Sequence, residues 1–204
     1  MESAQFQAVP SNSVVYEINI TTLPKDVITL DVDFLQKEIN NGKTSYTEKV
    51  GKATLYIVNE DWISGSIIDY VTYSMNKNLL ENARPLGSLK SALTCAKTSR
   101  INIHGAIAYL YHFEIFYAFR KQGLTNPFMQ LLLKTLAEEI EARYVLLQAY
   151  PAEKHPIEEI PKIQMRLEKI YSKAGFSVLK SSTPFYGTDH LPLTHMYYDL
   201  SKKH

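Results

Sequence analysis

The 204-residue sequence predicts an α/β (α+β) fold, with a mixed central sheet flanked by helices. The second half of the chain supports this, because its apolar pattern gives strand, helix, strand, helix, strand and strand in that order. Apolar residues make up 45% of the chain, which is enough for one buried core. No Gly-, Ser- or Pro-rich stretch divides the sequence, so we expect a single domain over residues 1–204.

The first 42 residues predict a strand followed by a short helix. Residues 1–12 are small and polar, and we expect them to be flexible, as chain ends usually are. Residues 14–20 alternate apolar and polar side chains, which is typical of a strand. Residues 33–40 have helical spacing, and Asn41-Gly42 is a plausible stop for that helix.

The next segment predicts two strands and an insertion. Residues 52–58 and 66–74 are rich in β-branched and aromatic residues and predict a hairpin or meander. Residues 76–105 have a mixed pattern and form an insertion whose structure the pattern does not define, although residues 88–96 favour a short helix.

Residues 106–119 are almost wholly apolar and aromatic, which predicts a central strand buried on both faces. A short basic turn follows, and then Asn126 suits a helix N-cap and Pro127 the first helical position. The apolar face of this helix comprises Phe128, Leu131, Leu132, Thr135, Leu136 and Ile140. The remaining predictions are strands at residues 144–150, 177–180 and 194–200 and an amphipathic helix over residues 163–174 that Gly175 and Phe176 close.

The strand, turn and helix start at residues 115–128 have the shape of an anion site. A helix N-terminus offers unpaired N–H groups and a partial positive charge. Arg120 and Lys121 add two full charges, and Gly123 allows the backbone to approach a ligand closely. We therefore expect a phosphate to bind here.

Charge and cysteine content narrow the function classes. The 22 basic and 21 acidic residues nearly cancel, which argues against a nucleic-acid partner. Cys95 is the single cysteine, so no internal disulfide can form and a cytoplasmic setting fits best. No zinc-type Cys/His spacing predicts a metal. Residues 1–10 show no basic region followed by an apolar run, and no run of 18 apolar residues occurs, so we expect neither secretion nor a membrane span.

Two motifs together resemble the GNAT superfamily of acetyl-CoA-dependent N-acetyltransferases. The turn Arg120-Lys-Gln-Gly-Leu-Thr125 is similar to that family's Arg/Gln-x-x-Gly-x-Gly/Ala, and Tyr171-Ser-Lys-Ala-Gly-Phe176 to its Tyr-x-x-x-Gly-Phe, about fifty residues later. The resemblance covers residues 106–200. Thr125 departs from the pattern, and Pro127 removes one backbone donor.

The resemblance implies acetyl-CoA as co-substrate and assigns roles to particular residues. The backbone from Lys121 to Asn126 would cradle its pyrophosphate, and the end of the strand would pair with the pantetheine arm. Gln164 stands where many members bond that arm through an Asn. Tyr171 would be the general acid that protonates the leaving thiolate. The implied cofactor-binding residues are Ile115, Phe116, Tyr117, Arg120, Lys121, Gln122, Gly123, Leu124, Thr125, Asn126 and Gln164.

The general base has several candidates. Glu114 and His112 lie just before the pantetheine-binding end of the strand, whereas Tyr109 and Tyr111 occupy the alternate face. Because side chains alternate along a strand, only one of these sets is expected to face the substrate. A chain of water molecules is a further option. We interpret His195 as structural or surface-exposed.

The resulting functional hypothesis is transfer of an acetyl or other acyl group from acyl-CoA to a primary amine by direct attack. The acceptor classes compatible with it are a small metabolite amine, a protein N-terminus or lysine, and, least in keeping with the charge, an aminoacyl-tRNA. The alternative is a catalytically silent protein of the same fold that binds an acyl-CoA or a protein partner. A homodimer is compatible with the aromatic content.

Overall fold

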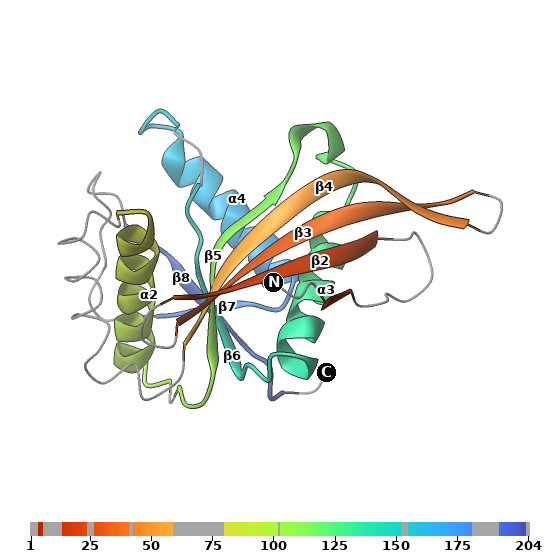
Figure 1. Ribbon diagram of the computed structural model, residues 1–204. Helices are drawn as coiled ribbons and strands as arrows, with labels where there is room; N and C mark the ends of the chain where they lie inside the picture. Colours follow the sequence, from red (N-terminus) through yellow and green to blue (C-terminus); the bar gives the residue numbers. More distant parts are fainter. Residues whose placement is uncertain are drawn as a thin grey trace.

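The computed structural model contains one eight-stranded mixed sheet (Figure 1). The structure describes residues 4–5, 14–23, 27–40, 43–58, 80–101, 103–151, 155–180 and 192–202. The strands, in their order across the sheet, are β1 (Ala4–Gln5), β2 (Val14–Leu23), β3 (Val27–Asn40), β4 (Lys43–Val58), β5 (Ile107–Ile115), β6 (Tyr144–Gln148), β8 (His195–Asp199) and β7 (Ser177–Val178). Only β5 and β6 are parallel neighbours among these strands; every other described pair is antiparallel.

Three helices of the described chain cover the two faces of this sheet. Helix α2 (Leu80–Thr98) packs on one face, where its apolar residues form a core cluster with β4, β5 and β6. Helices α3 (Thr125–Glu138) and α4 (Ile160–Lys173) contribute to the larger cluster on the other face. The arrangement confirms the predicted mixed sheet flanked by helices (Figure 1). Among the helices described, none is long and apolar enough to cross a membrane.

The predicted helix at residues 33–40 is wrong, because this segment belongs to β3. Its apolar residues alternate with Asp31 and Asp33, and this period of two continues back to residue 28. The buried residues are Leu30, Val32 and Phe34. Asn40 pairs with Lys43, so the two intervening residues, Asn-Gly, join two strands; this dipeptide is a strong hairpin signal.

The predicted strand at residues 52–58 is confirmed within β4, while its expected partner at residues 66–74 lies outside the described residues. The insertion at 76–105 contains α2, which is longer than the predicted helix at 88–96. The buried stripe of α2 lies within the predicted segment and comprises Leu89, Ala92, Leu93 and Ala96. The helix begins before this stripe, at Leu80.

The start of α3 differs from the prediction. The strand before it ends at Ile115, and a 3₁₀ turn, η2 (Tyr117–Phe119), follows. Asn126 is not the N-cap: Leu124 is, because its carbonyl accepts the N–H of Phe128 at 3.1 Å. Pro127 is thus the third helical residue, where its missing N–H would have no helical partner in any case. The helix therefore begins two residues earlier without losing a hydrogen bond.

The end of α4 confirms the predicted glycine stop. The N–H of Phe176 donates to the carbonyl of Tyr171 at 3.1 Å, and that of Gly175 to Ser172 at 3.0 Å, which together form a Schellman motif. Gly175 has a φ of +100°, a conformation that glycine adopts without penalty. The rings of Tyr171 and Phe176 meet edge to face, with centroids 6.0 Å apart, and supply the accompanying apolar contact.

Helix α2 is also held to the sheet by a buried histidine. The Nε2 of His195 lies 2.9 Å from the hydroxyl of Ser91, and the residue is 1% exposed. Burial lowers the pKa of His195 to about 4, from an ordinary value of 6.5. His195 is therefore neutral in the folded protein at physiological pH.

This histidine predicts a loss of stability in acid. Below pH 6.5 the unfolded chain binds a proton at His195, whereas the folded chain binds it only near pH 4. Stability therefore falls as the pH falls from 6.5 to about 4. The loss amounts to about 3 kcal/mol at its lower end. We expect His195→Gln to flatten the dependence of Tm on pH between 7 and 4, and the partly exposed His155→Gln to leave it unchanged. Parallel curves for His195→Gln and the wild type would contradict the assignment.

Candidate active site

The two parallel strands at the centre of the sheet separate at their C-terminal ends. Residues 107–110 of β5 pair with residues 144–147 of β6, but β5 continues to Ile115 paired only with β4. The segments that follow, η2 and the start of α4, lie apart at the top of Figure 1. Within the described part of the chain, one side of β5 therefore has no neighbouring strand over its last five residues, where an extended ligand can add as a strand does.

A β-bulge at Tyr111 changes which side chains face the same way. Thr54 of β4 pairs with His112 and the next residue, Leu55, pairs with Leu110, so Tyr111 is the extra residue. The alternation that predicted opposite faces for Tyr109 and His112 is therefore wrong. The bulge shifts the phase by one, so the side chains of Tyr109, His112 and Glu114 all lie on the α2 side of the sheet.

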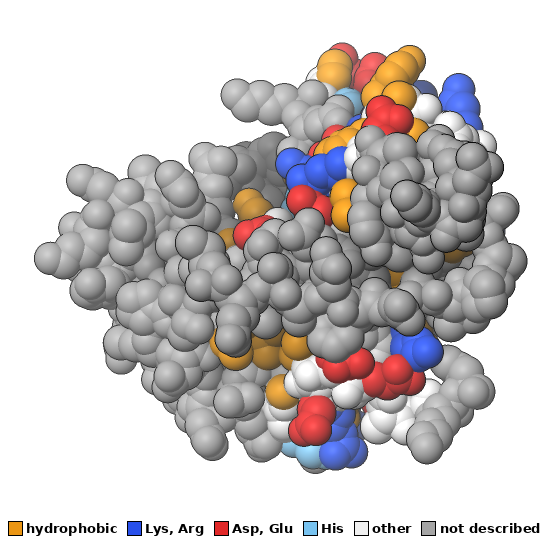
Figure 2. Space-filling model, turned by 45° about the vertical axis from the view of Figure 1, so that its right-hand side comes forward, with side chains coloured by type: hydrophobic (Ala, Val, Ile, Leu, Met, Phe, Trp, Pro, Cys, Tyr) orange, Lys and Arg blue, Asp and Glu red, His pale blue; other side chains and the backbone are white. Residues whose placement is uncertain are grey.

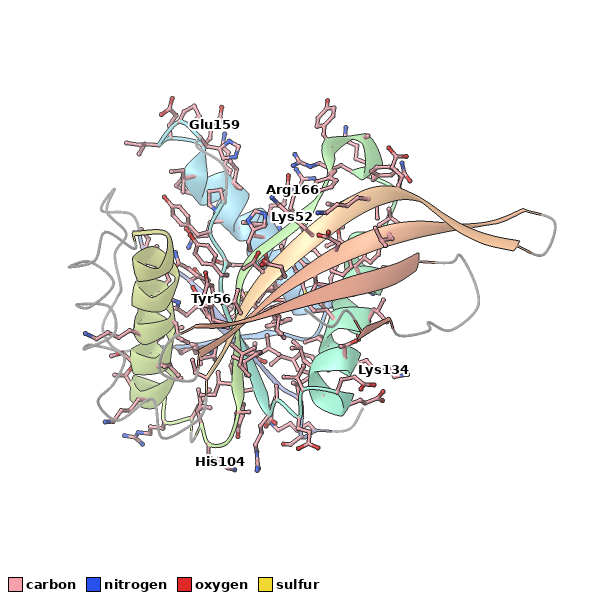
Figure 3. The ribbon with its side chains drawn as sticks, in the orientation of Figure 1. Lys52, Tyr56, His104, Lys134, Glu159 and Arg166 are labelled. Atoms are coloured by element: carbon pink, nitrogen blue, oxygen red, sulfur yellow. The ribbon has the colours of Figure 1, made fainter. Side chains whose placement is uncertain are left out.

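On the α2 side of the sheet, β3 and β4 also carry charged and hydroxyl side chains, in the part of the sheet that α2 does not cover. In Figure 3, Tyr56 lies beside α2, whereas Lys52 lies higher on the same strand. Figure 2 shows basic and acidic side chains gathered next to one another on the upper part of the molecule. We call this surface the polar face; it comprises Asp31, Asp33, Lys49, Lys52, Thr54, His112 and Glu114.

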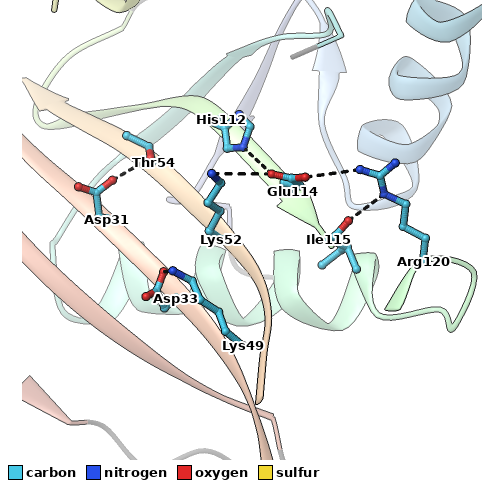
Figure 4. Close-up of polar contacts among 9 residues, drawn as sticks. All are labelled: Asp31, Asp33, Lys49, Lys52, Thr54, His112, Glu114, Ile115 and Arg120. Carbon is cyan, nitrogen blue, oxygen red and sulfur yellow. Dashed lines mark hydrogen bonds and ion pairs between the residues drawn. The ribbon is translucent and has the colours of Figure 1, made fainter. Parts of the chain in front are cut away.

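Ion pairs and hydrogen bonds order the polar face (Figure 4). Lys49 Nζ lies 2.6 Å from Asp33, and the hydroxyl of Thr54 donates to Asp31 at 2.8 Å. Neither aspartate was singled out by the sequence analysis, and neither was Lys52. Their signal is the alternation of polar residues along β3 and β4, which becomes informative only once the two strands are known to pair.

Glu114 is the most connected residue of the polar face. Its Oε2 lies 3.2 Å from His112 Nε2 and 3.9 Å from Lys52 Nζ, and its Oε1 lies 3.5 Å from Arg120 Nη2 (Figure 4). An ionised carboxylate only accepts hydrogen bonds, so Nε2 of a neutral His112 is the protonated nitrogen and Nδ1 keeps its lone pair. The pair can therefore orient Nδ1 as a proton acceptor. Both side chains are about one quarter exposed, so solvent and an acceptor can reach them.

The turn between β5 and α3 leaves backbone donors unused. Lys121 and Gly123 have φ angles of +68° and +75°, which curl the chain. The amides from Gln122 to Asn126 have no hydrogen-bond partner among the described residues. They lie at the N-terminus of a 14-residue helix, whose dipole favours an anion. The side chains of Lys121, Gln122 and Asn126 are exposed, so a ligand can approach the turn.

The end of β5 is arranged differently at each of the three residues expected to bind pantetheine. The carbonyl of Ile115 accepts a hydrogen bond from Arg120 Nε at 2.9 Å, and the N–H of Phe116 donates to Val50 of β4 at 3.0 Å. Tyr117 opens the 3₁₀ turn and is 85% exposed. Only Ile115 belongs to the strand.

Two buried tyrosines lie near the point where the strands separate. Tyr171 on α4 is 8% exposed, and burial raises its pKa to about 12. Burial also raises the pKa of Tyr109, which hydrogen-bonds Ser88 of α2 and interacts electrostatically with Tyr171 and Tyr111. Tyr171 therefore keeps its proton throughout the physiological range.

Gln164 lies about two helical turns before Tyr171 in α4 and is also buried. Its Nε2 donates to the carbonyl of Pro192 at 3.1 Å and to the hydroxyl of Thr194 at 2.7 Å. Both amide hydrogens therefore tie α4 to the segment before β8, and only the amide oxygen is left for a ligand. Among the described residues, no three His, Cys, Asp or Glu side chains lie together in a group that could hold a metal ion.

Comparison with solved structures relates this fold to acetyltransferases. The apo form of an agmatine N-acetyltransferase mutant superposes with a TM-score of 0.53 at 8% identity, over 83% of this chain and 75% of that one. Arabidopsis thaliana NAA60 in complex with acetyl-CoA gives 0.45 at 15% identity, over 82% and 76%. A chimera of the Vibrio cholerae spermidine N-acetyltransferase SpeG and hSSAT gives 0.44 at 11%, over 84% and 68%.

No protein-family model matches the chain, and no curated protein is similar to it in sequence. In its fold, the chain is similar to that agmatine N-acetyltransferase.

Proposed function

We propose that this protein is an N-acyltransferase that moves an acetyl or other acyl group from acyl-CoA directly to a primary amine. The observation that carries the proposal is the turn of unpaired amides that follows the end of β5, beyond the point where β5 and β6 separate. The unused amides from Gln122 to Asn126 flank one end of this opening, and the polar face flanks the other side of β5. A long anionic thioester can therefore lie in this opening, and an amine acceptor can approach it from the polar face.

The residues of the turn fit the pyrophosphate of coenzyme A. The amides from Lys121 to Asn126, with the side chains of Arg120 and Lys121, would bind it, since they combine backbone donors with positive charge. Gly123 is open: a Cβ built on it meets nothing within 4 Å. Thr125 is the first residue of α3, and the amide that Pro127 lacks lies outside the 122–126 set. Ile115 to Tyr117 would receive the pantetheine arm, with Gln164 offering its amide oxygen.

The bound acyl thioester would supply the electrophilic carbonyl. His112 Nδ1, oriented by Glu114, would take a proton from the acceptor's ammonium group, and the neutral amine so formed would attack the thioester carbonyl. Tyr171 would donate its proton to the departing sulfur, a role that its raised pKa of about 12 suits because the phenol is not ionised beforehand. Holding both substrates on one strand would supply much of the rate by proximity.

Ligand binding gives the direct test. We expect acetyl-CoA to raise the melting temperature, because a ligand that binds only the folded state stabilises it by about 2.7 kcal/mol at a hundredfold excess over Kd. For a chain of this length, that corresponds to a shift of roughly 5–10 °C. Adenine, which carries no phosphate, serves as the control ligand and should leave the melting temperature unchanged. An unchanged melting temperature with saturating acetyl-CoA would refute the cofactor assignment.

Substitution of His112, the proposed base, tests its role in the reaction separately from the binding of coenzyme A. His112→Gln should lower kcat by about a hundredfold, the lower range for losing a general base, while leaving the affinity for coenzyme A unchanged. Asp33→Asn is the matched control, since Asp33 lies on the same face and pairs with Lys49. Steady-state kinetics with an amine panel and calorimetric binding would measure both effects. Wild-type kcat in His112→Gln would exclude His112 as the base.

A second candidate is a catalytically silent protein of this fold that binds an acyl-CoA or a protein partner. The observation that favours it is the burial of Tyr171, which packs against Phe176 as an ordinary core residue would. Coenzyme A binding without acyl transfer to any amine in a broad panel would support this alternative over the enzyme.

A further inference from the structure

Arg120 turns back onto the strand that precedes it instead of pointing along the anion-binding turn. Its Nε donates to the carbonyl of Ile115 at 2.9 Å, and its Nη2 lies 3.5 Å from Glu114 (Figure 4). Its guanidinium carbon also lies 5.8 Å from the centre of the Tyr117 ring. These contacts place a cation across the end of β5, where the unpaired side of that strand begins its approach to the turn.

We propose that Arg120 is a latch that closes the acyl-CoA site in the ligand-free protein and is displaced from Glu114 when the cofactor binds. The inference rests on the proposed function, because the displacing group is the pyrophosphate of coenzyme A. In the closed state Arg120 occupies the Ile115 carbonyl, a main-chain acceptor that the pantetheine arm needs. In the open state its guanidinium turns to the phosphate.

The interaction between Arg120 and Glu114 is weak enough for Arg120 to exchange Glu114 for a pyrophosphate. The Arg120 and Glu114 side chains are 42% and 25% exposed and 3.5 Å apart, so the pair is screened by water and weak. A pyrophosphate offers more charge and several oxygens, to which a guanidinium can bind with two parallel hydrogen bonds. The arginine therefore leaves a weak partner for a strong one.

Opening the latch also changes the polar face. The charged and titratable groups around Glu114 are His112 on its own strand, Lys52 on β4 and Arg120 from the turn; Asp31 on β3 lies beyond Thr54. Once Arg120 leaves, Glu114 keeps only its contacts with His112 and Lys52. Glu114, the carboxylate that orients the proposed base His112, then interacts with one cation fewer. Binding of the cofactor therefore changes the charges around His112 on the acceptor side.

A double-mutant cycle on coenzyme A affinity tests the latch. Calorimetric titration of the full chain with coenzyme A should show that Glu114→Gln tightens binding by about two- to fivefold, the range set by a weak exposed ion pair. In an Arg120→Gln background the same change should have no effect, because no latch remains to be broken. Asp33→Asn, which removes a carboxylate paired with Lys49, should leave the affinity unchanged.

The alternatives give different results. Simple repulsion between Glu114 and the phosphates would tighten binding equally in both backgrounds, which would overturn the latch. NMR of the Arg120 Nε–H provides a second readout: it should be protected from exchange in the free protein and shift when coenzyme A is added. Binding of coenzyme A with this resonance unmoved would overturn the latch alone. Failure of the wild type to bind coenzyme A at all would overturn the proposed function and, with it, the latch.

Discussion

Replacing Tyr171 by Phe is expected to lower turnover by about a hundredfold while leaving coenzyme A binding nearly intact. The substitution removes only the hydroxyl from a ring that packs against Phe176, so the fold should be retained. Burial raises the pKa of Tyr171 to about 12, so the wild-type phenol stays protonated well into alkaline solution. Consequently the wild type should lose no activity through Tyr171 between pH 7 and 10.

The control is Tyr198→Phe, which removes a hydroxyl from another tyrosine of the same core cluster. It should leave turnover within about twofold of the wild type, because a conservative change away from the reacting atoms has a small effect. Melting temperatures of both variants would show that neither change unfolds the protein. Equal turnover in Tyr171→Phe and the wild type would remove Tyr171 from the mechanism.

Gly175→Ala is expected to cause a large loss of stability. A Cβ on Gly175 would lie 2.7 Å from Cε2 of the Tyr198 ring, and the residue has a φ of +100°. Steric overlap in the core and an unfavourable backbone conformation add, so we expect a loss of roughly 2–4 kcal/mol. For a chain of this length the melting temperature should fall by roughly 5–15 °C.

Two other glycines separate the contribution of steric overlap from that of the backbone conformation. Gly123 also has a positive φ, +75°, but has open space around it, so Gly123→Ala should cost only about 1 kcal/mol. Gly87 lies within α2 with open space and no positive φ, so Gly87→Ala should be neutral or stabilising by up to about 1 kcal/mol. Denaturant unfolding of the three variants would measure this order. A loss at Gly175 no greater than that at Gly123 would contradict the role of the Tyr198 contact.

Features encoded by neighbouring residues could be predicted from the sequence. The end of α4 is one: a tyrosine, a glycine and a phenylalanine within six residues define a Schellman motif whose hydrogen bonds are all local. The turn before α3 is another, although its N-cap was misplaced by two residues. Asn126 is a stronger cap than Leu124 by preference, but a following proline is tolerated anywhere in the first helical turn.

Features that depend on strand pairing could not be predicted in the same way. Residues 33–40 have an apolar spacing compatible with a helix, and only their pairing with β2 and β4 selects the strand. The polar face likewise combines residues of three strands that lie far apart in the sequence. The bulge at Tyr111 leaves no local signature, because an extra residue is defined only relative to the partner strand.

The bulge at Tyr111 gives β5 one residue more than β4 has to pair with it. Thr54 and Leu55 are consecutive in β4, whereas their partners His112 and Leu110 are separated by Tyr111. Deleting Tyr111 would therefore restore simple alternation and keep His112 and Glu114 on the polar face. Straightening the bulge with Tyr111 retained would instead shift the residues after it to the opposite face, carrying His112 and Glu114 into the apolar core. The polar face of this nine-residue strand therefore depends on the bulge.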